Sequence, residues 1–221
     1  MPLYRDFTDS TARILVWEFD EREPLDPRIL LEDEMREKFA SLHPKRQVEV
    51  LMVRRMLKKL CPNDKILYRE NGEPYLASGK AEISVSHSFP FAALAVSTKR
   101  IGIDLERIKP KIERIRHKFI LHEDAFIDDE NAAEYLTIIW SVKESLYKLH
   151  HSKYWSLKKN YEVMPFMPVA EMSIDCRVYD ENFSDDFTAK VYRFADYCFA
   201  VTSPRSASKR CSILRCSSTT P

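Results

Sequence analysis

The segment 101–106, with the sequence IGIDLE, constrains the fold more than any other part of the chain. Its alternation predicts a β-strand with three apolar side chains on one face and Gly102, Asp104 and Glu106 on the other. Neighbouring carboxylates repel each other unless a cation lies between them, and paired oxygen ligands suit a hard ion such as Mg²⁺. Gly102 would leave room for a bulky ligand. An exposed acidic strand edge is the simpler interpretation, and the hexapeptide alone favours it.

Length and composition limit what these carboxylates can belong to. A chain of 221 residues that is 44% hydrophobic can bury a core, as one large domain or as two small lobes. Lys plus Arg (35) nearly balances Asp plus Glu (34), so the overall charge predicts binding neither to nucleic acid nor to a membrane. The five cysteines lack a C-x-x-C spacing. With no long apolar run, the chain is expected to be cytoplasmic and without a transmembrane segment.

The first half of the chain alternates between strand and helix patterns. A first strand is predicted over 13–19, because this run is rich in β-branched and aromatic residues. Asp26-Pro27 predicts the start of one helix and Pro44 the start of a second. The expected core face of the first helix is Ile29, Leu30, Met35, Phe39 and Leu42. Turn residues separate further short strands, which are expected at 66–68, 75–76, 82–86 and 91–97.

Several polar residues in this half have two interpretations. The second helix carries the basic residues Lys45, Arg46, Arg54, Arg55, Lys58 and Lys59. Most of them are expected to form a solvated face, and Arg46 and Arg54 remain candidates for ligand binding. His87 lies in Ser86-His87-Ser88 at a strand end or turn. Taken in isolation it would be a turn residue with local hydrogen bonds.

The clearest helix pattern runs from about residue 131 to residue 149. At 100° per residue, one stripe is apolar and consists of Tyr135, Ile139, Val142, Leu146 and Leu149. An almost opposite stripe is polar and consists of Thr137, Ser141, Glu144 and Lys148. Glu144 and Lys148 are also spaced for an ordinary surface ion pair within the helix.

The segments before and after this helix complete the expected fold. Residues 109–118 are expected to be helical, and Glu123 would cap another helix start. Strands are predicted at 171–179, 187–194 and 197–203. The last strand, YCFAVTS, echoes FAALAVS of the first half, which indicates two similar lobes with the acidic strand near their junction. Residues 206–221, rich in serine and basic residues, are expected to form a mobile tail.

Four segments in this order resemble the motifs of the 4'-phosphopantetheinyl transferase family. They are NGEPY at 71–75, SVSHS at 84–88, GIDLE at 102–106 and WSVKESLYK at 140–148. The length and the two-lobed pattern are similar to the monomeric surfactin-synthetase-activating group. The resemblance spans residues 71–148, and the N-terminal third matches only loosely.

The resemblance implies a pseudo-dimeric α/β (α+β) fold with an N-terminal lobe over 1–100, a C-terminal lobe over 101–203 and a flexible tail over 204–221. It also implies transfer of 4'-phosphopantetheine from coenzyme A to a serine of an apo acyl or peptidyl carrier protein, with release of adenosine 3',5'-bisphosphate. Coenzyme A and the carrier protein would be the partners of a monomer, and Mg²⁺ the cofactor.

The same resemblance assigns roles to individual residues. Asp104, Glu106 and Glu144 would hold Mg²⁺. Glu123 would take the serine proton, while His87 and Lys148 would contact the diphosphate and stabilise developing charge. The residues expected to bind coenzyme A are Arg46, Arg54, Ser86, His87, Gly102, Lys143 and Lys148. Lys143 could instead be a structural lysine beside Trp140 and Tyr147.

Two other classes of function remain open. Leu149-His150-His151 lacks the glycine usual in the family after the lysine, which permits a non-catalytic homologue that binds coenzyme A or a carrier protein. A different Mg²⁺-dependent nucleotide phosphotransferase or hydrolase would turn over without a carrier protein.

Overall fold

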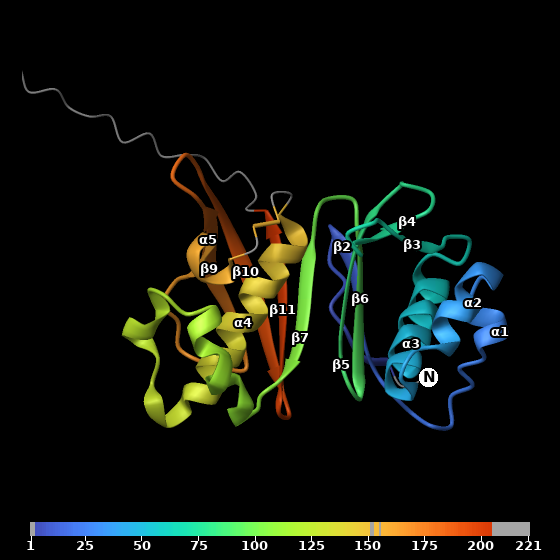
Figure 1. Ribbon diagram of the computed structural model, residues 1–221, viewed down its shortest axis with the longest axis horizontal. Coiled ribbons are helices and arrows are strands. Elements are labelled where there is room, and N and C mark those ends of the chain that lie inside the picture. The colour runs from blue at the N-terminus through green and yellow to red at the C-terminus, as the bar shows by residue number, and fades with distance from the viewer. Residues whose placement is uncertain (1–2, 151–152, 155, 205–221) are drawn as a thin grey trace, which may run out of the picture.

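The computed structural model describes residues 3–150, 153–154 and 156–204. Two antiparallel sheets pack face to face, and each carries a long helix on its outer face (Figure 1). The result is a mixed α/β fold, as predicted, with four layers in the order helix, sheet, sheet, helix.

The first sheet contains the strands that precede residue 100. Its strand order is β1-β2-β6-β5, with β1 (Leu3–Asp6), β2 (Ala12–Glu18), β5 (Glu82–Ser88) and β6 (Phe91–Ser97). Helix α3 (Pro44–Leu60) covers its outer face, and α1 (Pro27–Leu30) and α2 (Asp33–Ala40) lie beyond α3 (Figure 1). A separate hairpin pairs β3 (Ile66–Tyr68) with β4 (Pro74–Leu76).

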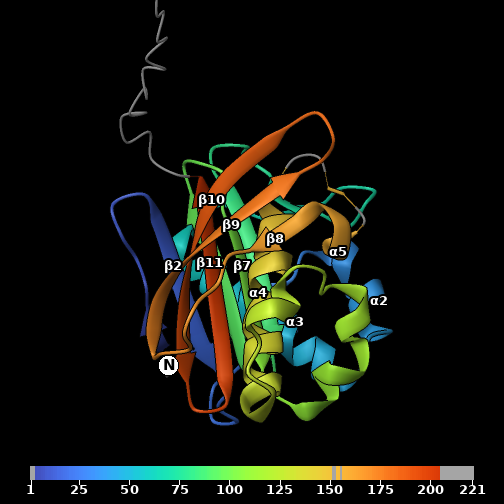
Figure 2. The same ribbon diagram turned by 90° about the vertical axis from the view of Figure 1, so that its left-hand side faces the viewer.

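The second sheet contains the strands that follow residue 100. Its order is β7-β11-β10-β9-β8, with β7 (Gly102–Arg107), β8 (Tyr161–Val163), β9 (Glu171–Tyr179), β10 (Ser184–Phe194) and β11 (Tyr197–Pro204). Helix α4 (Ala132–Leu149) lies against β7 and β11 (Figure 2). The short helices around α4 are η1 (Pro110–Lys118), η2 (Glu123–Phe126), η3 (Asp129–Asn131) and α5 (Leu157–Asn160).

The strand alternation read from the sequence decides which core each side chain enters. Ile101, Ile103 and Leu105 face the first sheet and belong to the core between the two sheets. Asp104, on the opposite face of β7, meets α4 instead. The predicted two-sided character of this strand is therefore confirmed, and its apolar face lies in the middle of the molecule.

The predicted apolar stripe of α4 is buried along its whole length. Tyr135, Ile139, Val142, Leu146 and Leu149 are all buried. The polar stripe faces the acidic strand, because Ser141 donates a hydrogen bond to Asp104. The expected surface pair between Glu144 and Lys148 is replaced by an ion pair between Lys148 and Asp104.

The single helix predicted from Asp26 to Leu42 is wrong. Asp26 does cap a helix by accepting a hydrogen bond from the backbone N–H of Arg28, but α1 ends after one turn, and Leu31 is extended. Ile29, assigned to the core face, is 71% exposed. The local apolar cluster formed by Leu30, Leu31, Phe39 and Leu51 is small and gains its contacts from two short helices rather than one.

The predicted boundaries at residues 100 and 203 and the pseudo-dimeric relation of the two halves remain predictions. The predicted tail over 204–221 lies outside the described residues except for Pro204, which ends β11. Among the described residues, no helix is both long and apolar enough to cross a bilayer.

Candidate functional site

The two sheets are joined at the edge of β7 by serine hydroxyls of β5. Ser84 accepts a hydrogen bond from the backbone N–H of Ile103 (3.0 Å), and Ser86 accepts one from the N–H of Leu105 (3.0 Å). Because alternate N–H groups of an edge strand point outward, serines spaced by two match them. The SVSHS segment therefore fixes where Asp104 lies, and Ser86 has a structural role alongside the predicted ligand role.

Asp104 is a buried carboxylate that contacts three side chains from two other elements. Its Oδ1 accepts hydrogen bonds from Ser86 Oγ (3.0 Å) and Lys148 Nζ (2.7 Å), and its Oδ2 accepts one from Ser141 Oγ (2.8 Å). Lys148 also donates to the carbonyl oxygen of Ile103 (3.0 Å). The acidic strand and the polar stripe of α4 thus meet as the sequence predicts.

Glu106 and Glu144 add negative charge around the ion pair between Asp104 and Lys148. Burial, and then the charge of Asp104, raise the pKa of Glu106 to about 7. The same two causes raise the pKa of Glu144 to about 6, while Lys148 opposes both shifts. Trp140 donates an indole hydrogen bond to Glu106 (3.4 Å). Three carboxyl groups and one ammonium group therefore share a half-buried region.

The donor chemistry of this carboxylate cluster, Asp104, Glu106 and Glu144, fits a divalent cation. Oxygen donors with surplus negative charge are what Mg²⁺ selects, and the raised pKa values show that the charge is incompletely compensated. In the described part of the chain, however, no three His, Cys, Asp or Glu side chains are grouped so that they could hold a metal ion as they stand. Lys148 is the cation that contacts Asp104 here.

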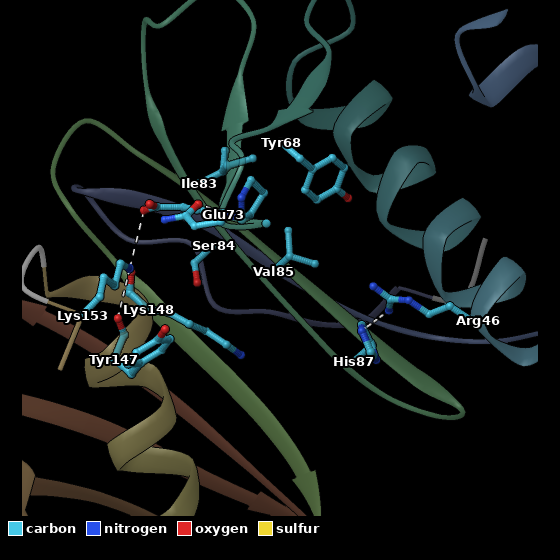
Figure 3. A pocket seen from close by; sticks show the side chains of 13 residues that line it. Arg46, Tyr68, Glu73, Ile83, Ser84, Val85, His87, Tyr147, Lys148 and Lys153 are labelled. Carbon is cyan, nitrogen blue, oxygen red and sulfur yellow. Dashed lines mark hydrogen bonds and ion pairs between the residues drawn. The ribbon is translucent and has the colours of Figure 1, made fainter. Parts of the chain in front are cut away.

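A cleft of about 280 Å³ opens beside the carboxylate cluster, between α3, the β3–β4 hairpin, β5 and α4 (Figure 3). This volume is just below the range of about 300–1,000 Å³ that is typical of ligand pockets. Four of its lining side chains carry or can acquire positive charge, namely Arg46, His87, Lys148 and Lys153. The cleft therefore suits an anionic ligand.

At one end of the cleft, His87 lies between two side chains of α3. Its Nε2 contacts Nη1 of Arg46 (Figure 3). Its Nδ1 lies 3.0 Å from Glu49 Oε2. Arg46 also pairs with Glu49 (3.3 Å). Burial first, and then Arg46, lower the pKa of His87. His87 lies within β5 with charged partners, which removes the interpretation as an isolated turn residue.

At the other end of the cleft, an ion pair connects the two halves of the chain. Lys153 Nζ lies 3.5 Å from Glu73 Oε1, in the turn between β3 and β4 (Figure 3). Lys153 also donates to the carbonyl oxygens of Tyr147 (3.0 Å) and Lys148 (2.7 Å) at the end of α4. Sequence reasoning missed Lys153 and Glu49, because a single charge outside a motif carries no periodic signal.

Glu123 and Lys143 form a separate, fully buried ion pair. Their side chains are 1% and 0% exposed, and Lys143 Nζ lies 2.6 Å from Glu123 Oε1. Glu123 also accepts hydrogen bonds from the backbone N–H groups of Leu121 (3.0 Å) and Val163 (3.2 Å), and Lys143 donates to the carbonyl of Phe119 (2.6 Å). A base must reach the proton that it removes. Neither side chain lines the cleft; proton transfer by Glu123 stays a prediction, and so does the choice between coenzyme binding and a structural role for Lys143.

Gly102 and Arg54 do not line the cleft either, and their ligand roles stay predictions. A Cβ atom on Gly102 would lie 1.8 Å from the carbonyl oxygen of Ser145, so α4 fills the space expected for a ligand. Arg54 is 2% exposed, donates to the carbonyl of Ile66 (3.3 Å) and lies against the ring of Tyr68. Tyr68 lines the cleft, and Arg54 lies behind it.

Comparison with known proteins agrees with the motifs and the geometry. Residues 100–202 match the family model of the 4'-phosphopantetheinyl transferase superfamily. The 4'-phosphopantetheinyl transferase gsp of Aneurinibacillus migulanus is 31% identical over 107 residues, an alignment that covers 44% of this chain and 44% of that relative. The part of the chain that carries β7 and α4 is therefore similar to this superfamily. The resemblance drawn from the sequence is confirmed.

Proposed function

We propose that this protein transfers 4'-phosphopantetheine from coenzyme A to a serine of an apo acyl or peptidyl carrier protein. The observation that carries the proposal is that the carboxylate cluster borders the cationic cleft, with Lys148 common to both. Coenzyme A is an anionic substrate whose diphosphate contains the bond to be broken. Such a substrate needs cations along its phosphates and a carboxylate beside the reacting phosphorus.

In the proposed reaction, the serine oxygen forms a bond to the phosphorus that carries the pantetheine group. The bond between this phosphorus and the bridging oxygen breaks, and adenosine 3',5'-bisphosphate leaves with the electron pair. His87 and Lys148 would bind diphosphate oxygens and stabilise the charge that develops on them, and Arg46 would bind a phosphate from the outer end of the cleft.

Glu123 remains the proposed acceptor of the serine proton, directly or through water. A second hollow, lined by Glu106, Trp140 and Ile112 and flanked by Lys109 and Lys111, leaves a carrier protein room to approach Glu106 from outside the cleft.

Asp104, Glu106 and Glu144 would hold Mg²⁺, which when bound supplies positive charge to the diphosphate. For Asp104 to take part, Lys148 must share or release its contact with this carboxylate. Since Lys148 is one of the proposed diphosphate contacts, binding of coenzyme A provides an alternative partner for its ammonium group.

Intact mass spectrometry of an apo carrier protein tests the proposal. After incubation with this protein, coenzyme A and Mg²⁺, the carrier should gain the mass of one phosphopantetheinyl group. A carrier with alanine at the acceptor serine, and the variant Asp104→Asn, are the matched controls and should show no gain.

The same experiment separates the two alternatives. A non-catalytic homologue would bind coenzyme A without modifying any carrier, and a different phosphotransferase or hydrolase would consume coenzyme A without a carrier. Either result would overturn the proposed transfer reaction.

A further inference from the structure

Glu49 is the one acidic residue of α3, and it lies behind the two cationic groups at the outer end of the cleft. It is 7% exposed and contacts both His87 and Arg46. Its sequence neighbours on the helix are apolar, so neither periodicity nor a motif draws attention to it. Its position makes it the group that connects the two side chains most able to receive a phosphate there.

The contacts define which nitrogen of His87 carries a proton. A carboxylate only accepts, so His87 Nδ1, which lies 3.0 Å from Glu49 Oε2, carries a hydrogen and donates it. Nε2 of the neutral ring is then an acceptor, which suits its contact with the guanidinium group of Arg46. Without a ligand, His87 is neutral and its Nε2 is occupied by Arg46.

An anionic oxygen cannot bind to this form of His87, because an unprotonated Nε2 and a phosphate oxygen are both acceptors. Two changes are needed together. Arg46 must leave Nε2, and the anion is a suitable new partner for its guanidinium group. Nε2 must also take up a proton from solvent. The resulting imidazolium would donate one hydrogen bond to the anion and one to Glu49.

We infer that Glu49 is a positioning residue that holds His87 through Nδ1 and couples the binding of an anionic oxygen at Nε2 to the uptake of one proton. The inference rests on the proposed function, in which that anion is a phosphate of coenzyme A. The carboxylate of Glu49 compensates the charge of the imidazolium, so that the proton stays on His87 while the ligand is bound.

Charged groups from three elements face His87. Arg46 and Glu49 belong to α3, Lys148 to α4 and Asp104 to β7. Burial, Arg46 and Lys148 lower the pKa of His87, whereas Glu49 and Asp104 raise it. When Arg46 moves from the ring to a bound anion, its positive charge no longer lowers the pKa of His87 as strongly. The negative charge of the anion raises this pKa. The free protein therefore holds His87 neutral near pH 7.5, and the complex favours the protonated ring.

Calorimetry of coenzyme A binding in buffers with different ionisation enthalpies measures this proton directly. At pH 7.5 the wild-type protein should take up more protons than His87→Gln, by a difference that approaches one as the complex becomes fully protonated. The difference is needed because Glu106 and Glu144 also titrate in this range and can contribute protons of their own. Equal uptake by the two proteins would overturn the inference.

The pH dependence of affinity tests the part played by Glu49. Glu49→Gln can still accept a hydrogen bond from Nδ1 but loses the charge that supports the imidazolium. Its dissociation constant for coenzyme A should begin to rise at a lower pH than that of the wild type. A shift of about one pH unit corresponds to roughly tenfold weaker binding above the transition. Glu49→Asp, which keeps the charge, should retain the wild-type midpoint even if binding is weaker at every pH.

Glu37→Gln, at an exposed position of α2, is the matched control and should bind like the wild type. Circular dichroism of each variant establishes that it is folded. If Glu49→Gln does not fold, the comparison of wild type with His87→Gln and Glu49→Asp still decides the outcome.

The failures of the two proposals are distinguishable. If no variant and no wild-type protein binds coenzyme A, the proposed function is wrong, and this inference falls with it. If coenzyme A binds and Glu49→Gln has the wild-type pH profile, only the role of Glu49 is wrong.

Discussion

Helix α4 separates two groups of buried carboxylates that differ in their charge balance. On one side, Glu123 has a single buried cation, Lys143, and two backbone N–H donors. On the other, Asp104, Glu106 and Glu144 share one lysine, Lys148. Lys143 belongs to the first group and Glu144 to the second. These adjacent residues lie on different sides of the helix because successive side chains point about 100° apart.

The difference shows that burial by itself does not leave a carboxylate with uncompensated charge. Glu123 is the more deeply buried acid, yet its charge is fully matched, and it contributes to the packing of η2 and β8 around α4. The carboxylate cluster is less buried and has surplus negative charge, which a bound cation or a proton can compensate. Uncompensated charge beside a cleft is the better guide to the site.

The largest effect is expected from breaking the buried ion pair between Glu123 and Lys143. Lys143→Met would leave Glu123 as a buried charge without its partner, so the free energy of unfolding should fall by about 3–5 kcal/mol in urea denaturation. The double variant with Glu123→Gln should recover part of this loss, because no unpaired charge remains. A stable Lys143→Met that no longer binds coenzyme A would show that Lys143 contacts the ligand after all.

A smaller energetic effect, on catalysis rather than on stability, is expected from a change in the carboxylate cluster. Glu144→Gln should slow carrier modification by about 10²- to 10³-fold, the range typical for losing one group that stabilises a transition state. Its free energy of unfolding should stay the same or increase, since one of three repelling charges is removed. Urea denaturation measures the free energy of unfolding, and the transfer assay measures the rate of carrier modification. If Glu144→Gln lowered both, the proposed difference between the two groups of carboxylates would be wrong.

The smallest effect concerns the pH dependence of stability. The pKa of Glu106 rises from 4.5 to about 7 and that of Glu144 from 4.5 to about 6, so the folded state binds more protons than the unfolded state between these values. Stability from these groups is complete below pH 4.5 and is lost as pH rises through about 7. The melting temperature measured from pH 4.5 to 8 should show this decline, and Glu106→Gln should reduce it.

Magnesium provides the control for that measurement. Because metal ligands must be deprotonated, Mg²⁺ should raise the melting temperature more at pH 8 than at pH 5. An equal effect at both values would indicate that the ion binds elsewhere.

Much of the site could be predicted from short-range sequence periodicity. The alternation of 101–106 correctly divided apolar from acidic side chains, and the stripes of the helix near 131–149 correctly turned Ser141 and Lys148 toward Asp104. These predictions succeed because the backbone geometry of strands and helices sets the directions of side chains independently of the rest of the fold. The single helix after Asp26 failed because its apolar face had too little core to cover.

What the sequence by itself determined is which residues share a face of β7 and of α4, together with the family whose motifs they resemble. The tertiary structure alone decided which charges are compensated. It paired Glu123 with Lys143, placed Glu49 behind His87, and filled the space beside Gly102 with the backbone of α4. Each of these contacts joins segments far apart in the chain, or depends on how closely two elements approach. Charge compensation depends on distance in space, and sequence spacing reports that distance only within a single helix or strand.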